Sequence, residues 1–115
     1  MPNYVALTYT ADVDWSHPDQ AAEMREYNEF AKAAAAVIRG GAALYPTATA
    51  TTVRTSAKGG DVVASDGPYA ETKEALTGFY LFECADLDEA IAWAARIPAA
   101  WNGAVEVRPL VPPMG

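Results

Sequence analysis

Two segments with helical periodicity, each lying between segments with the two-residue periodicity of strands, constrain the fold of this chain most strongly. Apolar residues recur at steps of three and four from Met24 to Ile38, and a second such stripe runs from Leu87 to Ile97. Stripes of this kind are typical of helices that cover one face of a sheet. Because each helix follows a strand and returns to another, the pattern indicates a ferredoxin-like split β-α-β arrangement in the α+β class.

The boundaries of these elements follow from local signals. The first helix is expected to begin near Pro18, and Gly40 and Gly41 are expected to close it in left-handed conformations. Asp86 and Glu89 have the spacing of a capping box at the start of the second helix. Alternating or β-branched and aromatic residues predict the strands of the main sheet. These strands are expected at residues 4–9, 42–45, 77–84 and 104–108.

A hairpin is expected between the second and third of these strands. Residues 49–55 are rich in threonine and valine, Lys58-Gly59-Gly60-Asp61 has the composition of a turn, and residues 62–64 are extended again. We therefore predict an insertion at the edge of the sheet.

With both helices on one face of the sheet, the opposite face is left bare. The first and third predicted strands of the main sheet nevertheless carry apolar and aromatic residues on both faces, and no third helix is predicted to cover the second face. A homodimer that packs sheet face against sheet face is the simplest way to bury it.

Composition limits the partners of the chain. Its 115 residues, 51% of them hydrophobic, suffice for one core, so a single domain is expected over residues 1–115. The 15 acidic and 8 basic residues give a net charge of -7, and no cluster of Lys or Arg interrupts that balance. Nucleic acid and anionic membranes are therefore not expected as partners.

Neither export nor a cofactor is expected. The amino terminus lacks a basic segment followed by an apolar one, and the longest apolar run, residues 33–38, is far too short to span a membrane. The single cysteine, Cys84, is expected to be a buried thiol, which fits the reducing cytoplasm. The chain has no phosphate-binding glycine loop and no Cys or His cluster, so no cofactor and no metal is predicted, and His17 is expected to be solvated near a helix cap.

Ionisable and aromatic side chains are concentrated just before the strand at residues 77–84. Asp66-Gly67-Pro68-Tyr69 is typical of a turn, but a turn does not require the charged residues that follow it. A loop in this position is expected to close over a pocket between the sheet and a helix. The candidate ligand-binding residues are Tyr69, Lys73, Tyr27, Trp101 and Arg108.

Two carboxylates of this segment are candidates for catalysis. Partial burial would raise the pKa of Asp66 or Glu71 towards the range useful for proton transfer, and Lys73 is suited to an anionic substrate group. The alternative is structural, with Glu71 and Lys73 anchoring the loop to Arg108 or Glu106. For Trp15, Trp93 and Trp101, packing in the core or at an interface is preferred to stacking on a substrate.

Several motifs along the chain occur together in one known family. They are Asp66-Gly67-Pro68-Tyr69-Ala70-Glu71-Thr72-Lys73-Glu74, Gly78-Phe79-Tyr80, Leu87-Asp88-Glu89-Ala90, Pro98-Ala99-Ala100-Trp101 and Val105-Glu106-Val107-Arg108-Pro109. On these motifs the chain closely resembles the DGPF branch of YCII-related proteins over nearly its whole length. Tyr69 stands where the name of the branch has Phe, and Thr77 stands where Gly is usual.

The resemblance implies a dimeric α+β barrel, in which two ferredoxin-like subunits pack their sheets together. Relatives on this barrel include muconolactone isomerases, cofactor-free monooxygenases and haem-degrading enzymes, so the architecture allows isomerase-like or cofactor-free acid-base chemistry without selecting it. Some YCII-type proteins use a His-Asp pair with the histidine on the first helix. Here Tyr27, Asn28 and Glu29 occupy that region, so the pair is not carried over.

Two functions follow as expectations. The first is a small cytoplasmic bacterial dimer that binds an organic molecule, with acid-base chemistry by Asp66 and Glu71. The second comes from the association of such proteins with extracytoplasmic-function sigma factors, and is a non-catalytic accessory or ligand-sensing role.

Overall fold

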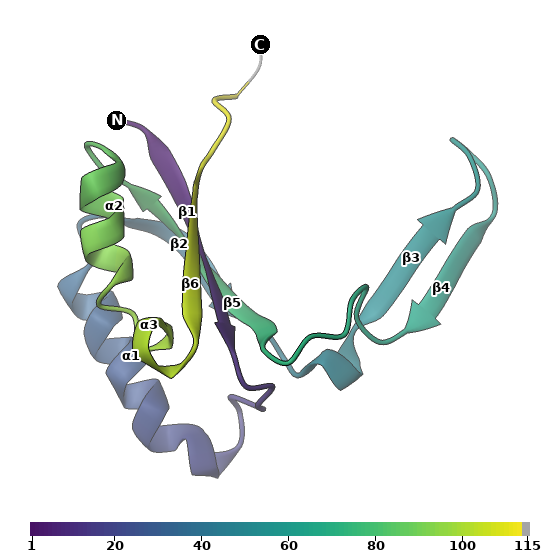
Figure 1. Cartoon of the computed structure of the whole chain (residues 1–115), viewed down its shortest axis with the longest axis horizontal. Coiled ribbons are helices and arrows are strands. Elements are labelled where there is room, and N and C mark those ends of the chain that lie inside the picture. Colours follow the sequence, from purple (N-terminus) through teal and green to yellow (C-terminus); the bar gives the residue numbers. More distant parts are fainter. Residues whose placement is uncertain (114–115) are drawn as a thin grey trace.

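The computed structural model describes residues 1–113 and contains a four-stranded antiparallel sheet in the order β2-β5-β1-β6 (Figure 1). One helical segment connects β1 to β2, and another connects β5 to β6. This is the ferredoxin-like arrangement, so the predicted α+β fold is confirmed. The strands are β1 (Asn3–Thr10), β2 (Ile38–Ala43), β5 (Ala75–Glu83) and β6 (Ala104–Pro109).

Strand β1 divides its side chains between the two faces of the sheet as its two-residue period predicts. Tyr4, Ala6 and Thr8 are buried under the helices. Val5 and Leu7 point to the opposite face and are only partly buried. The face under the helices therefore forms the core, and the other face is open in the single chain.

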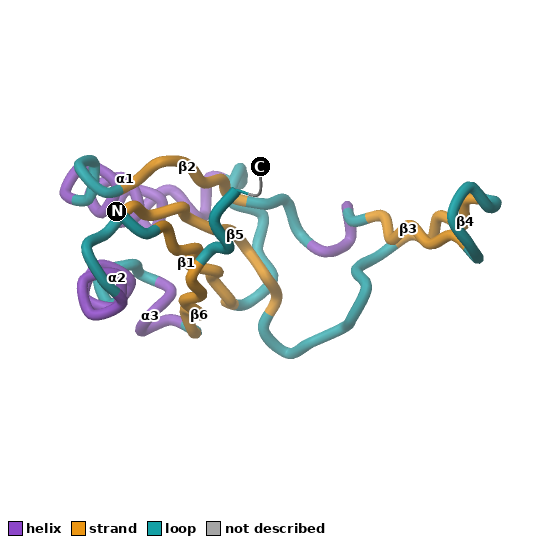
Figure 2. The backbone as a smooth tube through the Cα atoms, turned by 90° about the horizontal axis from the view of Figure 1, so that it is seen from above, coloured by secondary structure: helices purple, strands orange, loops and turns teal. Residues whose placement is uncertain are grey.

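All three α-helices cover the same face of the sheet (Figures 1 and 2). Asp86 caps α2, because its carboxylate accepts a hydrogen bond of 2.9 Å from the backbone N–H of Glu89. The Glu89 carboxylate in turn accepts one of 3.0 Å from the backbone N–H of Ala85. The predicted capping interaction is confirmed. The helices are α1 (Ala21–Ala33), α2 (Leu87–Ala94) and α3 (Ala99–Asn102).

Helix α1 is shorter than its apolar stripe suggests. It follows the short 3-10 turn η1 (Pro18–Gln20), for which the His17 side chain serves as the cap, and it ends at Ala33. Residues 34–37 form a turn, and Ile38 already belongs to β2. The prediction that the helix continues to Gly40 was wrong, because strand pairing with β5 takes over at β-branched Ile38.

Gly41 consequently lies inside a strand and does not close a helix. Its φ of 151° is rarely adopted by residues with a side chain, and an added Cβ would lie 2.5 Å from the carbonyl oxygen of Phe79. The glycine lets β2 approach β5 closely, next to an irregularity of the ladder between Ile38 and Gly40.

The predicted hairpin is present, but it forms a separate two-stranded sheet and does not extend the edge of the main sheet. We call residues 46–73 the arm; it contains η2 (Thr47–Thr49), β3 (Thr51–Thr55) and β4 (Val62–Asp66). Figures 1 and 2 show the arm projecting from the main sheet on the side opposite the helices. Pro46 contributes to this separation, because it has no backbone N–H with which to continue a strand ladder.

Candidate functional site

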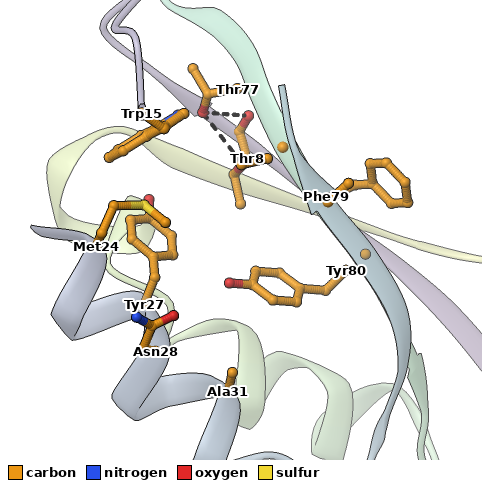
Figure 3. A pocket seen from close by; sticks show the side chains of 13 residues that line it. Thr8, Trp15, Met24, Tyr27, Asn28, Ala31, Thr77, Phe79 and Tyr80 are labelled. Carbon is orange, nitrogen blue, oxygen red and sulfur yellow. Dashed lines mark hydrogen bonds between the residues drawn. The ribbon is translucent and has the colours of Figure 1, made fainter. Parts of the chain in front are cut away.

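A pocket of about 200 Å³ lies between α1 and the end of the sheet formed by β2 and β5 (Figure 3). Met24, Tyr27 and Asn28 line it from α1. Trp15 lines it from the loop that follows β1, and Tyr80 lines it from the sheet. The side chains that form the pocket therefore come from distant parts of the chain.

The aromatic side chains of Trp15, Tyr27 and Tyr80 contribute to the wall. The rings of Trp15 and Tyr27 meet edge to face, with their centroids 5.3 Å apart. Tyr80 packs edge to face on Phe30 at 5.2 Å and stacks with Phe82 at 6.0 Å. Such contacts fix the ring orientations and leave an apolar interior.

Three buried threonines form a hydroxyl cluster on the pocket side of the sheet. The Thr10 hydroxyl donates to Oγ1 of Thr77 at 3.1 Å, and the hydroxyl oxygens of Thr8 and Thr77 are 3.4 Å apart (Figure 3). The β1–β5 ladder shifts register between Thr8 and Tyr9, which turns Thr77 towards the helix side. The cluster satisfies its own polar groups where a purely apolar core would be expected.

The two tyrosines differ in the position of their hydroxyls. Figure 3 shows the Tyr80 hydroxyl pointing into the pocket. The Tyr27 hydroxyl is buried and has no hydrogen-bond partner among residues 1–113. The backbone of Ala99 acts to lower the pKa of Tyr27, but burial outweighs it.

Burial raises the pKa of both tyrosines further above neutral pH. It is the largest cause of the raised pKa of Tyr27, with the negative charge of Glu23 second, and it alone raises the pKa of Tyr80. At neutral pH both groups are therefore hydrogen-bond donors and not bases. The described residues that line the pocket include no Asp, Glu, His, Lys or Arg, so the lining is uncharged. Elsewhere in residues 1–113 no group of three or more His, Cys, Asp or Glu side chains is placed to hold a metal ion.

Comparison with known proteins agrees with this architecture. The sequence model of the YCII-related domain matches residues 3–113. The chain belongs to the YCII-related domain family. This YCII-related domain is also 46% identical, over 94 residues, to an uncharacterised protein of Rhizobium meliloti (strain 1021); the match covers 80% of this chain and 70% of that protein. Membership of the DGPF branch stays a prediction from the motifs.

The segment predicted to form the site lies on the arm of the YCII-related domain. Asp66, Tyr69, Glu71 and Lys73 are all exposed, and none of them lines the pocket. Tyr69 is 78% exposed and packs against Arg54, whose guanidinium lies 5.0 Å from the centre of the ring. Within the single chain the loop does not close the pocket, and the roles predicted for these residues stay predictions.

The remaining predicted residues are dispersed. Tyr27 lies in the pocket. Trp101 is 59% exposed and lines a separate depression of about 220 Å³ between α1 and the segment that carries α3. Arg108 pairs with Glu106 on β6 at 2.5 Å. Among the described residues no ion pair connects Arg108 or Glu106 to the arm, so the predicted anchor is not formed in the single chain.

Sequence reasoning missed Met24 and the threonine cluster as pocket residues, and it favoured core or interface packing for Trp15. A usable signal existed in β1, where Thr8 and Thr10 occupy the face that also carries Tyr4 and Ala6. Hydroxyl groups on the core face of a central strand suggest a polar lining or a shared hydrogen-bond cluster. That signal did not identify the β5 partner, because the register shift that turns Thr77 inward is not visible in the sequence.

No helix within residues 1–113 of the YCII-related domain is long and apolar enough to cross a membrane. Cys84 is fully buried and unpaired, and burial raises the pKa of its thiol. The prediction of a buried thiol is confirmed, and its raised pKa disfavours the reactive thiolate.

Proposed function

We propose that this YCII-related domain binds a small, uncharged organic molecule that is largely apolar or aromatic and carries a hydrogen-bond acceptor. The observation that carries the proposal is the uncharged aromatic pocket into which the Tyr80 hydroxyl points. An ionic ligand would lose its hydration there without gaining an opposite charge. A neutral acceptor atom would instead receive a hydrogen bond from Tyr80.

The size of the pocket supports a small ligand. Its volume of about 200 Å³ is below the roughly 300–1,000 Å³ typical of sites for drug-sized molecules. Trp15 and Met24 offer the flat and polarisable surfaces that suit an aromatic ring.

Acetophenone is a suitable probe, because it combines one aromatic ring with a neutral carbonyl acceptor, and benzoate is its charged counterpart. In NMR titrations we expect saturable shifts from acetophenone at the pocket residues and at least tenfold weaker binding of benzoate. Tyr80→Phe keeps the ring and removes the hydrogen-bond donor. It should therefore weaken the binding of acetophenone about tenfold, which is the usual contribution of one hydrogen bond.

A second pair of variants tests the location. Ala31 is partly buried and lines the pocket, whereas Ala22 is exposed on the first turn of α1. Ala31→Leu should fill the pocket and abolish acetophenone binding, and Ala22→Leu should leave it unchanged. Equal binding by both variants would place the site elsewhere and refute the proposal.

We also propose that the chain forms a homodimer through the open face, which we define as Val5, Leu7, Tyr9, Phe79 and Leu81. The β1–β5 register puts these side chains on the sheet face opposite the helices, where each is only partly buried. The charged pair Glu106 and Arg108 lies beside Leu7 and Val5 on the same face. Partly exposed apolar side chains grouped in this way are typical of an interaction site. Sedimentation equilibrium should give about twice the mass of 12.2 kDa at micromolar concentration.

A charge at the centre of the open face tests the dimer without disturbing the core. Leu7 lies opposite Glu106 in the β1–β6 register, so the lysine of Leu7→Lys has a carboxylate beside it in its own subunit, one that Glu106 already shares with Arg108. We expect this variant to be monomeric. Leu87→Lys is the matched control, because Leu87 is 46% exposed on α2. A dimeric Leu7→Lys variant would contradict a dimer formed through the open face.

Acid-base catalysis by Asp66 and Glu71 and a partnership with an extracytoplasmic-function sigma factor stay predictions. In the single chain neither carboxylate lines the pocket, so catalysis there would require the arm of another subunit. A loss of turnover in Asp66→Asn and Glu71→Gln, with acetophenone binding retained, would support catalysis. Copurification of a sigma factor with the tagged chain would support the accessory role.

A further inference from the structure

Among residues 1–113 the hairpin of the arm forms no strand ladder with the main sheet. Within the described residues β3 and β4 pair only with each other. The arm projects clear of the helices and the main sheet in both views (Figures 1 and 2). The radius of gyration is 16.1 Å, whereas a compact domain of this length is expected to have about 13 Å.

The base of the arm is held in a defined direction. The Asp12 carboxylate accepts hydrogen bonds from the backbone N–H of Thr47, at 3.0 Å, and from its hydroxyl. The Thr52 hydroxyl donates to the carbonyl of Gly67 at 2.8 Å, which ties the two strands of the arm together near their base. These contacts position the arm but do not cover it.

One face of the hairpin carries three exposed apolar side chains, together with Thr51, Thr55 and Asp66. In the β3–β4 register Val53 lies opposite Ala64, and Thr55 lies opposite Val62, so these side chains share one face. We call Val53, Val62 and Ala64 the apolar arm face. Val53 is 60% exposed and Val62 is 68% exposed. Since an isolated two-stranded hairpin is at best marginally stable in water, this face indicates a missing contact surface.

The arm and the open face border the same space. The arm stands on the side of the main sheet opposite the helices, which is the side of the open face (Figures 1 and 2). One body placed against the open face is therefore flanked by the arm. A single partner can cover both uncovered surfaces.

The exposed area agrees with an extensive interface. The chain exposes 7711 Å², whereas a compact monomer of its mass of 12.2 kDa is expected to expose about 6,100 Å². The excess is about 1,600 Å², twice the roughly 800 Å² that each partner buries in a standard interface. An area of this size is typical of subunits that form a permanent assembly.

We propose that the arm crosses to a second copy of this chain and packs its apolar arm face on the body of that copy. This inference rests on the proposed homodimer and adds to it an exchange of arms. With two-fold symmetry each arm packs against the other subunit, so both arms are covered and the assembly is limited to two chains. Because each chain carries a net charge of -7, the apolar surface buried in the contact has to outweigh the repulsion between the two copies.

Excision of the arm tests the exchange directly. The backbone N–H of Leu44 donates to the carbonyl of Thr77 at 2.9 Å, and the β2–β5 register, if continued beyond Ala43 and Gly78, would bring residues 46 and 75 opposite each other. Replacing residues 47–74 with Asn-Gly should therefore close β2 and β5 into a simple hairpin and leave the body folded. We expect the dissociation constant of the dimer, from sedimentation equilibrium, to rise at least 100-fold. An unchanged constant would overturn the proposal.

Point variants of the intact arm provide a matched pair. Val53 belongs to the apolar arm face, whereas Val63 lies on the other face of the hairpin and is similarly exposed, at 57%. Val53→Ser should weaken the dimer about tenfold, and Val63→Ser should change it less than twofold. Equal effects of the two variants would overturn the assignment of the contact face.

Hydrogen exchange separates this proposal from the dimer on which it rests. Amides of β3 should exchange slowly above the dissociation constant of the full-length chain and quickly below it. A dimer in which the amides of β3 exchange their hydrogens quickly would refute the exchange of arms between subunits. It would leave the open-face dimer standing. If Leu7→Lys stayed dimeric while excision of the arm gave a monomer, the open-face proposal would fail and the arm exchange would stand.

Discussion

Gly41 is the residue whose backbone conformation most restricts substitution in the main sheet. Its φ of 151° disfavours a side chain, and a Cβ there would meet the Phe79 carbonyl oxygen at 2.5 Å. We expect Gly41→Ala to lower the free energy of unfolding by about 3 kcal/mol, from backbone strain and overpacking together. Urea denaturation measures this value.

Gly40 is the matched control for that substitution. A Cβ there would lie 3.3 Å from Cδ1 of Leu81, the end of a flexible side chain. Gly40→Ala should therefore cost less than about 1 kcal/mol. Equal losses at both positions would show that Gly41 has no special role.

The buried tyrosines of the pocket predict a loss of stability at alkaline pH. Burial raises the pKa of Tyr27 and of Tyr80 above the ordinary value of about 10, so the folded chain keeps protons that the unfolded chain releases. Their contribution to stability is complete below about pH 10 and is lost as the pH rises towards the folded pKa values. The melting temperature should therefore fall above about pH 10.

Thermal melts of Tyr27→Phe between neutral and alkaline pH check this explanation. The variant should lose less stability above pH 10 than the parent, because one group with a raised pKa is absent. Tyr45→Phe, at a tyrosine that is 68% exposed, is the control. Cys84 also contributes stability that is lost as the pH rises, because burial raises the pKa of its thiol. Its effect begins at a lower pH than that of the tyrosines, since an ordinary thiol has a lower pKa than a phenol. Identical pH profiles for Tyr27→Phe and the parent would contradict the assignment.

At the scale of elements, α2 depends on its cap. Asp86 accepts the N–H of Glu89, and Asp88 lies in the first turn without such a bond to the backbone among the described residues. Asp86→Ala should lower the free energy of unfolding by about 1 kcal/mol, the usual value of an N-cap. Asp88→Ala should cost about half of that or less, because it removes only an interaction with the helix dipole. Equal losses in urea denaturation would argue against a cap at Asp86.

Elements set by local patterns were predicted well, and those that depend on pairing were not. The alternation in β1 and the cap of α2 were recognised because both signals lie within a few residues. The end of α1 was misplaced, because Ile38 fits two patterns. It continues the helical spacing of apolar residues, and it is equally suited to be the first residue of β2. Only its pairing with Phe82 on β5 decides between the two.

At the scale of the whole molecule, stability is unevenly distributed between the body and the arm. The main sheet has a continuous core under its helices, whereas the arm has only its own ladder. In the monomeric Leu7→Lys variant we expect trypsin to cut the arm first, after Arg54 or Lys58, because both residues are exposed. The body should resist digestion on the same timescale.

The parent chain provides the comparison for that digestion. If the arm is covered by a second copy, cleavage after Arg54 should slow as the protein concentration rises above the dissociation constant of the dimer. In Leu7→Lys the rate should not depend on concentration. Concentration-independent cleavage of the parent would contradict coverage of the arm by another copy.

The sequence by itself determined the α+β class, the sheet with helices on one face, the hairpin and the family, because periodicity, caps and short motifs are local properties of the chain. Tertiary structure alone decided that Asp66 and Glu71 lie on an exposed arm and that Trp15, Tyr27 and Tyr80 converge on a pocket. These positions depend on the register of strands distant in sequence and on the direction in which the arm leaves the sheet. The physical reason is that the periodicity of a segment depends on its own residues, whereas the strand with which it pairs depends on the packing of the whole chain.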